Sequence, residues 1–415
     1  MNEKILSNIH QPAQLEQLYR ANKALFTKEF KKVYPQIQEI PIAHFWNERL
    51  QYESDTISWG SRKDFLFILI TSLLAGLLAK FPVLFGINEE FFFPRNISFL
   101  VLPFLTTYFA WKNKWQRKGI IFMAAATAIC AFYVNSLPYD VDTSDSLILV
   151  CIHLPLLLWV ILGVSFAGND YANHRKRLAF LRFNGDLLVM SALLVLAGII
   201  TTGITIGLFQ LIGYNIEEFY FEYIVVFVLP AVPITATYLT QTNPQLVNKV
   251  SPVIAKIFSP LVLLMLLIYL GAIVFSGKNP YIDREFLLLF NILLIGVMAL
   301  IFFSVAESAS NENSASGKWI LLLLSVATIL VNGIALSAIL FRIFEGGFTP
   351  NRIAVLGSNI LMLIHLLILT YQQFEAIKDK EKIVQIEKSI AAFLPVYLVW
   401  VLAVVFLLPF IFNFQ

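Results

Sequence analysis

Residues 147–167 read LILVCIHLPLLLWVILGVSFA and contain no lysine, arginine, aspartate or glutamate. A helix rises about 1.5 Å per residue, so a run of this length reaches about 30 Å, the thickness of the hydrocarbon core of a membrane. The bilayer core offers no water to the backbone, and a helix satisfies its own peptide groups. The stretch therefore predicts a helix that crosses a membrane.

Similar apolar runs recur on both sides of this stretch, and short charged breaks separate them. Reading each long run as one crossing gives eleven expected spans, with edges defined to within a few residues. They are residues 65–87, 97–111, 119–137, 147–167, 185–212, 222–242, 257–277, 286–307, 319–343, 352–374 and 391–412. The sequence therefore predicts an all-α, polytopic integral membrane helix bundle of about eleven transmembrane helices over residues 63–415.

The composition of the 415-residue chain agrees with a membrane bundle and excludes other classes of protein. Hydrophobic residues make up 58% of the chain and charged residues 14%, whereas an ordinary soluble domain is about 25% charged. The formal net charge of +3 is too small to indicate a nucleic-acid partner. Cys130 and Cys151 are the two cysteines, and each lies in an apolar run. We therefore expect no disulfide framework, no metal site and no cofactor.

Lysine and arginine are divided unevenly between alternate loops, and this bias sets the expected orientation because basic residues stay on the cytoplasmic side. One set of loops holds Lys112, Lys114, Arg117, Lys118, Arg175, Lys176, Arg177, Arg182, Lys249, Lys256, Lys318, Lys378, Lys380, Lys382 and Lys388. The other set holds only Arg95, Lys278, Arg284 and Arg352. We therefore expect the N-terminus in the cytoplasm and, after an odd number of crossings, the C-terminus outside.

Residues 1–62 lie outside the expected spans and are predicted to form a cytosolic amphipathic helical segment. Pro41 opens one stretch of helical spacing, which runs through Phe45, Trp46 and Leu50. An earlier helix is predicted from the spacing of Leu15, Leu18, Tyr19, Leu25, Phe26, Phe30 and Val33. About sixty residues build a marginal core, so the segment is expected to pack on loops, on the membrane surface or on a cytosolic partner. Structural, interaction and regulatory roles are all open for it.

Several patches spread over the chain carry a family resemblance. They are QPAQLEQLYRANKALFTKEFKKVYPQI at 11–37, FWNERLQYE at 45–53, SPLVLLMLLIYLGAIV at 259–274 with NPYI at 279–282, and GGFTPNRIAVLGSNILML at 346–363. In these patches the chain resembles the bacterial multi-pass membrane proteins catalogued as domain of unknown function four-one-five-three. The resemblance implies a protein of the bacterial cytoplasmic (inner) membrane, and it implies no reaction, substrate or catalytic residue.

Polar groups inside the expected spans are the best candidates for function, because such groups are costly in a bilayer. The sequence contains no phosphate-binding glycine loop, paired-histidine zinc helix or nucleophile elbow, so we assign no catalytic residue and favour a non-enzymatic protein. His365 lies near the middle of the tenth span and Asn332 in the ninth, while Pro230 and Pro233 are expected to bend or break the sixth. We expect these four residues to line one water-accessible region. The alternative is dry packing with hydrogen bonds between neighbouring helices.

The loop FRIFEGGFTPNRIAV, residues 341–355, is expected to make the turn between the ninth and tenth spans. Gly346 and Gly347 suit the end of one helix, Thr349 suits the cap of the next, and Pro350 suits its first position. This pattern predicts a tight helical hairpin.

Arginines flank this turn and are expected to form a cluster at the outer interface. Arg352 falls in the first turn of the tenth span, where the helix dipole disfavours a cation, so it requires an anionic partner. Glu345 is the nearest carboxylate in the loop, and Arg342 precedes it by about one turn. We expect Arg342, Glu345 and Arg352 to act either as a structural lock or as a site for a phosphate head group or another anion.

Three functions are compatible with these features. Transport or translocation of a small molecule or a lipid among the spans comes first, because a proline-rich span, scattered intramembrane polar groups and little extramembrane mass occur together. A non-enzymatic sensor or scaffold that binds a partner through residues 1–62 is the alternative. A membrane-embedded transferase acting on a lipid-linked substrate comes third, because the expected outer loops supply acids with little partnered histidine or lysine. Membrane lipids are expected partners in every case.

Overall fold

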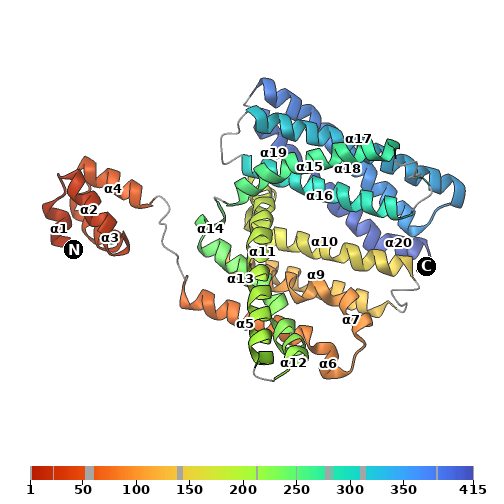
Figure 1. Ribbon diagram of the computed structural model, residues 1–415, viewed down its shortest axis with the longest axis horizontal. Helices are drawn as coiled ribbons and strands as arrows, with labels where there is room; N and C mark the ends of the chain where they lie inside the picture. The colour runs from red at the N-terminus through yellow and green to blue at the C-terminus, as the bar shows by residue number, and fades with distance from the viewer. Residues whose placement is uncertain are drawn as a thin grey trace. The chain divides into compact units, whose positions relative to one another are not determined.

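The described residues of the chain are mostly helical, and the chain separates into two compact units. The computed structural model describes residues 2–21, 23–51, 60–137, 144–211, 214–248, 250–275, 281, 284–308, 315–379 and 382–414. All regular secondary structure in these residues is helical (Figure 1). One unit comprises Met1–Ser61 with Thr242–Gln245, and the other comprises Arg62–Gln241 with Leu246–Gln415. We refer to them as the N-terminal unit and the membrane unit.

The N-terminal unit has its own hydrophobic core, built by four helices. They are α1 (Asn2–Ser7), α2 (Pro12–Ala21), α3 (Lys23–Ile37) and α4 (Pro41–Gln51). Leu15 of α2, Phe26 and Phe30 of α3 and Trp46 of α4 are all buried in this core. The expectation of two helices is therefore wrong, and the physical reason is burial. A single helix over residues 12–37 would have no surface for its apolar stripe, whereas two helices bury their stripes against each other.

Nine helical segments among the described residues are long and apolar enough to cross a membrane. The helices concerned are α9 (Arg117–Ser136), α10 (Asp145–Ala167), α11 (His174–Leu211), α13 (Val226–Thr242), α15 (Val250–Phe275), α16 (Arg284–Ser308), α17 (Ala315–Gly346), α18 (Pro350–Lys378) and α19 (Ile383–Leu402). Shorter pieces join or extend them, namely the 3₁₀ turn Gly168–Asp170, α12 (Glu217–Phe219), the π-helical turns Tyr220–Val225 and Ala403–Leu407, α14 (Gln245–Asn248) and α20 (Leu408–Ile411). The chain is thus an all-helical membrane protein.

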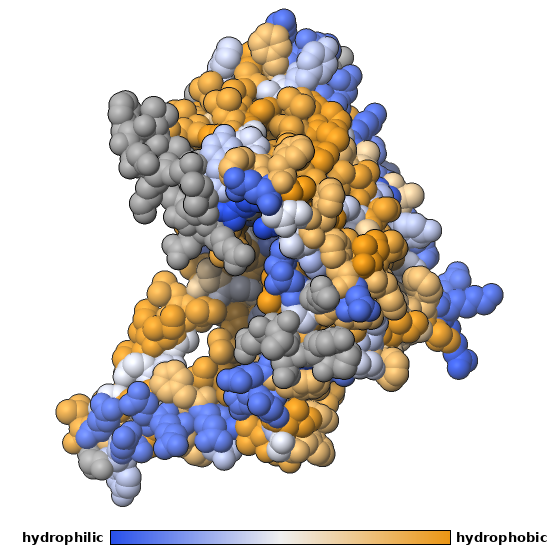
Figure 2. Space-filling model, turned by 90° about the vertical axis from the view of Figure 1, so that its right-hand side faces the viewer, coloured by the Kyte–Doolittle hydropathy of each residue, from blue (hydrophilic) through white to orange (hydrophobic). Residues whose placement is uncertain are grey.

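Large apolar side chains on these helices point away from the protein. Phe132 of α9, Leu188 of α11 and Ile268 of α15 are each more than half exposed. Hydrophobic residues cover much of the face in Figure 2, and hydrophilic residues gather in separate groups. An apolar surface of this extent is unfavourable in water and matches the hydrocarbon of a bilayer.

The first expected span, 65–87, is divided between two helices and is not among the nine segments that are long and apolar enough to cross a membrane. Helix α5 (Arg62–Ala79) carries three charged residues in its first turn, and α6 (Phe81–Phe85) follows it. Backbone bonds from Lys80 N to Gly76 O, 3.0 Å, and from Leu84 N to Lys80 O, 3.0 Å, keep the path helical across the junction. Gly86 then ends it with a φ of +64°.

The second expected span, 97–111, is not a single helix. Residues Glu89–Asn96 form α7, Ile97–Leu100 form a 3₁₀ turn, and α8 runs only from Leu102 to Lys112. Eleven residues of helix cover about 16 Å, roughly half of the hydrocarbon core. Pro103 at the start of α8 lacks a backbone donor, which accounts for the interruption.

Most helices of the membrane unit fall into two groups, each around one of its hydrophobic cores. Helices α15 to α19 surround one core, which includes Phe290, Leu324 and Leu366. Helices α5, α8, α10, α11 and α13 contribute to a second core around Phe109 and Phe180. Helix α10 contacts α8 and α11 as well as α18 and α19, and Figure 1 shows it between the two groups. Helix α18 therefore lies inside the bundle, in contact with α10, α17 and α19.

Candidate functional site

The turn between α17 and α18 sets the register of the two helices that carry the main candidate residues. Gly347 adopts a φ of +73°, a conformation that glycine adopts at little cost, and its N–H donates to Ile343 O at 2.9 Å. The Thr349 hydroxyl accepts a hydrogen bond from Arg352 N at 3.3 Å, and Pro350 is the first residue of α18. The structure confirms the turn expected from the sequence.

The expected Arg-Glu-Arg cluster does not form. Arg352 donates from Nη1 to Gly347 O at 2.7 Å, and Arg342 donates from Nε to Tyr281 O at 3.1 Å. Within the described part of the chain, Glu345 makes no ion pair with either arginine. The physical reason is that the last carbonyls of a helix lack partners and carry partial negative charge. The end of α17 thus supplies the partner that Arg352 needs at the start of α18.

Gly346 leaves room for the same contact. A Cβ at this position would lie 2.7 Å from both terminal guanidinium nitrogens of Arg352, too close for any side chain without displacing the guanidinium. The two glycines therefore have different tasks, because Gly347 supplies the left-handed turn and Gly346 leaves room for the capping arginine.

Asn332 and Asn359 meet in the interior between α17 and α18. Both side chains are fully buried, and Asn332 Nδ2 donates to the backbone oxygen of Asn359 at 3.2 Å. Asn332 Oδ1 and both amide atoms of Asn359 have no hydrogen-bond partner among the described residues. Farther along the same helix pair, Ser325 Oγ donates to Gln373 Oε1 at 3.0 Å.

His365 lies on α18 between these two contacts and faces α19. Its Nδ1 lies 3.0 Å from the Tyr397 hydroxyl, and its ring stacks on Phe393 with the centroids 4.2 Å apart. The imidazole is fully buried, and Nε2 has no hydrogen-bond partner in the described structure. One ring nitrogen is therefore held by tyrosine, and the other is buried without a hydrogen-bond partner among the described residues.

Five polar residues of helix α18 lie in two stripes, spaced by seven residues in one and by fourteen in the other, and both spacings return to nearly the same face of a helix. Ser358, His365 and Gln372 face α19, where they bond to Trp400 Nε1 at 2.9 Å, Tyr397 and Ser389 Oγ at 2.7 Å. Asn359 and Gln373 face α17. These residues of α18 and the side chains that they bond to form a polar column. From residue 358 to residue 373 the column is about 22 Å long, most of the thickness of a hydrocarbon core.

The sequence indicates only part of this column. His365 and Asn332 were identified from their depth in the spans, but Gln372, Gln373 and Tyr397 were not. The seven-residue spacing along α18 was the available signal. The partner helices were not predictable, because their register follows from tertiary packing.

Pro230 and Pro233 lie elsewhere in the membrane unit. Both are inside α13, which continues without interruption to Thr242, so the helix is not broken at either proline; the alternative expectation of a bend stays a prediction. The preceding π-helical turn, Tyr220–Val225, widens the backbone just before the first proline. Their neighbour Ile234 belongs to the core that α13 shares with α5, α8, α10 and α11, whereas Asn332 and His365 belong to the α15–α19 group. The four residues expected in one region are thus divided between two helix groups.

Two ion pairs at the two ends of α5 are also not predicted from the sequence. Lys80 Nζ lies 3.1 Å from Glu222 Oε1 and 4.3 Å from the ring centroid of Tyr223. Lys112 Nζ lies 2.8 Å from Asp64 Oδ1. One member of each pair, Lys80 or Asp64, is buried, and its partner offsets a charge that would be costly alone, which gives both pairs a structural explanation.

The described residues contain no group of three or more histidine, cysteine, aspartate or glutamate side chains arranged to hold a metal ion. Comparisons of the chain with models of protein families, with curated proteins and with solved structures find no match. The family resemblance described above stays a prediction.

Proposed function

We propose that this protein transports or translocates a small molecule or a lipid along the polar column of α18. The observation that carries the proposal is the concentration of buried polar atoms without partners, namely His365 Nε2, Asn332 Oδ1 and the Asn359 amide. Leaving a buried donor or acceptor unsatisfied costs about 1–3 kcal/mol. A passing solute or a chain of water molecules would satisfy these atoms, and dry packing would not.

The chemistry of the column indicates the kind of solute. Its named side chains are amides, hydroxyls, an imidazole and an indole, and none carries a fixed charge. Such a lining favours hydrogen-bonding groups that are themselves uncharged, including the polar part of a lipid. This lining supports a path rather than a catalytic centre, since its named side chains include no carboxylate, thiol or lysine beside the hydrogen-bonded pair of His365 and Tyr397.

We place the protein in the bacterial cytoplasmic membrane, with its N-terminus inside and its C-terminus outside. The support is the excess of lysine and arginine in alternate loops and the resemblance to multi-pass bacterial proteins. The number of crossings is odd whether or not the segment from α5 to α8 crosses the membrane twice, so the expected orientation is the same for nine or eleven spans.

Cysteine labelling in sealed vesicles tests the proposal. In a background with Cys130 and Cys151 replaced by alanine, Asn359→Cys and Asn332→Cys should react with a small, charged, membrane-impermeant thiol reagent. A translocation path must be reachable from each side in turn, so reaction is expected in both right-side-out and inside-out vesicles.

Two matched controls define the result. Ile364→Cys lies on the exposed surface of α18 and should stay unlabelled in lipid, whereas Phe348→Cys in the exposed turn should react readily from one side. If Asn359→Cys and Asn332→Cys resemble Ile364→Cys, the interior is dry and transport through it is excluded. Reaction from a single side would indicate a static pocket and would also contradict the proposal.

A further inference from the structure

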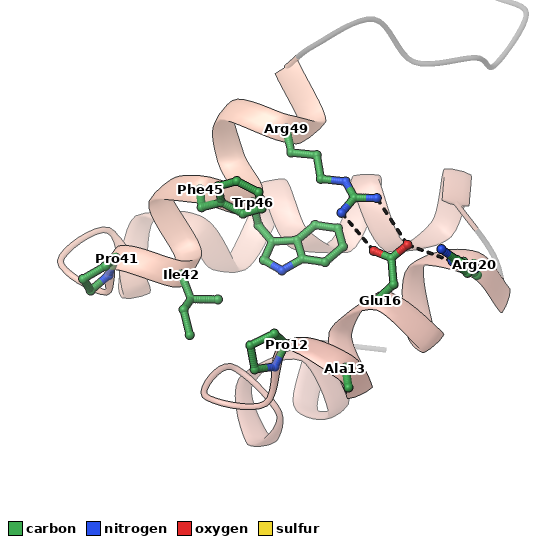
Figure 3. Close-up of a pocket in the computed structure, with 9 residues that line it drawn as sticks. All are labelled: Pro12, Ala13, Glu16, Arg20, Pro41, Ile42, Phe45, Trp46 and Arg49. Carbon is green, nitrogen blue, oxygen red and sulfur yellow. Dashed lines mark hydrogen bonds and ion pairs between the residues drawn. The ribbon is translucent and has the colours of Figure 1, made fainter.

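The N-terminal unit carries an open groove between α2 and α4 that the transport proposal does not use. Its apolar lining includes Pro12, Pro41, Ile42 and Phe45, with the buried Trp46 as its floor. Figure 3 shows the Trp46 indole between an apolar end, marked by Ile42 and Pro12, and a charged end. The cavity measures about 790 Å³, enough for several side chains of another molecule.

Phe45 marks the apolar part of the groove as a contact surface. Its ring is 63% exposed, although four other large aromatic residues of this unit, Tyr19, Phe26, Phe30 and Trp46, pack on one another. An exposed aromatic ring beside an apolar groove is typical of a residue that anchors a partner.

The charged end has two arginines for one carboxylate. Glu16 receives Arg20 Nε at 2.8 Å and Arg49 Nη1 at 3.0 Å, and the hydrogen bond from Arg20 holds the pKa of Glu16 below its usual range. The guanidinium of Arg49 is also fixed over the Trp46 ring, 4.7 Å from its centroid. With Glu16 ionised, this end keeps a net positive charge and has spare guanidinium donors.

We propose that the groove binds a segment of a protein partner that presents a bulky apolar side chain and, about one helical turn away, a carboxylate. The apolar side chain would contact Phe45 and Trp46, and the carboxylate would pair with Arg49 and Arg20. A groove between two helices suits an amphipathic helix, whose anchors recur every three or four residues.

The charge balance of the N-terminal unit favours a protein segment, rather than the surface of an anionic membrane, as the occupant of the groove. Residues 1–61 contain seven lysine or arginine residues and seven aspartate or glutamate residues. Attraction to anionic lipids requires an excess of basic residues, and this unit has none. The positive charge is confined to one end of the groove, which matches a single carboxylate.

Selection from a displayed library of random peptides tests the proposal on the full-length protein in lipid nanodiscs. Peptides are selected on the wild-type protein and counter-selected on the Phe45→Ala/Arg49→Gln double variant. We expect enrichment of sequences with an aromatic or aliphatic anchor and an aspartate or glutamate one turn away. Their affinity, measured by fluorescence anisotropy, should fall about tenfold or more in Phe45→Ala and in Arg49→Gln.

Lys31→Gln is the matched control, because it removes one exposed positive charge from α3, outside the groove, and should leave affinity unchanged. Hydrogen exchange of α1 to α4 checks that each variant is folded. If Arg49→Gln unfolds the unit, Phe45→Ala still tests the proposal, because Phe45 is exposed and its truncation should leave the fold intact. The proposal is overturned if nothing is enriched over the double variant, if enriched peptides are basic, or if Phe45→Ala binds them equally well. Protection of α4 by phosphatidylglycerol nanodiscs without any peptide would identify the membrane as the occupant and would also overturn it.

Discussion

Both units of this chain bury apolar cores, but they differ in the side chains that they expose and in the polar groups that they bury. In the N-terminal unit, Phe26 and Phe30 are fully buried, and lysines such as Lys31 are exposed. In the membrane unit, Phe132 is 77% exposed, whereas Asn359 is fully buried. The difference shows that each unit folds against a different solvent. Water drives apolar groups inward, whereas hydrocarbon accepts them and leaves packing and hydrogen bonds to hold the helices together.

Truncating a phenylalanine in each unit should give the largest contrast. Phe30→Ala removes a ring stacked between Phe26 and Tyr34 and should destabilise the N-terminal unit by about 3–5 kcal/mol, enough to unfold a core of this size. Phe132→Ala on the lipid-facing surface should change stability by no more than about 0.5 kcal/mol. Hydrogen exchange of the full-length protein in nanodiscs measures both. Unchanged protection of α1 to α4 in Phe30→Ala would show that this unit has no core of its own.

An arginine introduced at two equally exposed positions, one in each unit, should destabilise the membrane unit and leave the N-terminal unit nearly unchanged. Ile199 on α11 is 64% exposed and Phe45 on α4 is 63% exposed. Ile199→Arg should cost about 2.5–3.5 kcal/mol, because arginine in the middle of a span is unfavourable in hydrocarbon, whereas Phe45→Arg should be within about 0.5 kcal/mol of neutral. The measurement is the fraction of protein inserted in membranes and its thermal stability after solubilisation. Equal effects at the two positions would mean that they face the same solvent.

Glycine substitutions in the α17–α18 turn should have an intermediate effect. Gly347→Ala places a side chain at a φ of +73°, which costs roughly 1–2 kcal/mol. Gly346→Ala should cost stability through Arg352, whose guanidinium must move, so its effect should shrink in an Arg352→Gln background. A double-mutant cycle on thermal unfolding in detergent checks this. Additive effects of Gly346→Ala and Arg352→Gln would show that the observed contact contributes nothing.

The smallest effect is expected from pH in the N-terminal unit. Because the folded-state pKa of Glu16 is lowered by Arg20, its ion pairs stabilise the unit above the ordinary glutamate pKa and are lost as pH falls through the lowered value. An exposed pair of this kind contributes at most about 1 kcal/mol. The hydrogen-exchange protection factors of α2 and α4 should therefore fall in acid for wild type but less so for Glu16→Gln. An identical acid response of both proteins would contradict the assignment.

Much of the fold was predictable from the sequence, because hydropathy reports the solvent that a helix faces. The expected span 147–167 coincides with α10, and the glycine, threonine and proline of the α17–α18 turn act as expected. Hydropathy does not predict where a helix ends once it has left the membrane. Helix α11 begins at His174 rather than near residue 185, because basic residues such as Arg175 and Lys176 are compatible with a helix that extends beyond the membrane.

The candidate site was predicted only in part, for a different physical reason. Depth in a span identified His365 and Asn332, but the partner of Arg352 is a backbone carbonyl, which no sequence pattern marks. The same applies to Tyr397, whose hydroxyl meets His365 only because α18 and α19 pack in one register. Contacts of this kind depend on tertiary packing, which residue spacing within a single helix does not specify.

A structure of the full-length protein in a lipid nanodisc, at a resolution that shows water, tests the central claim most directly. We expect ordered water or a bound solute within hydrogen-bonding distance of His365 Nε2 and the Asn359 amide, continuing along α18 towards Gln373. Apolar side chains closing on His365 Nε2 and Asn359 from every direction, with no density between them, would contradict it.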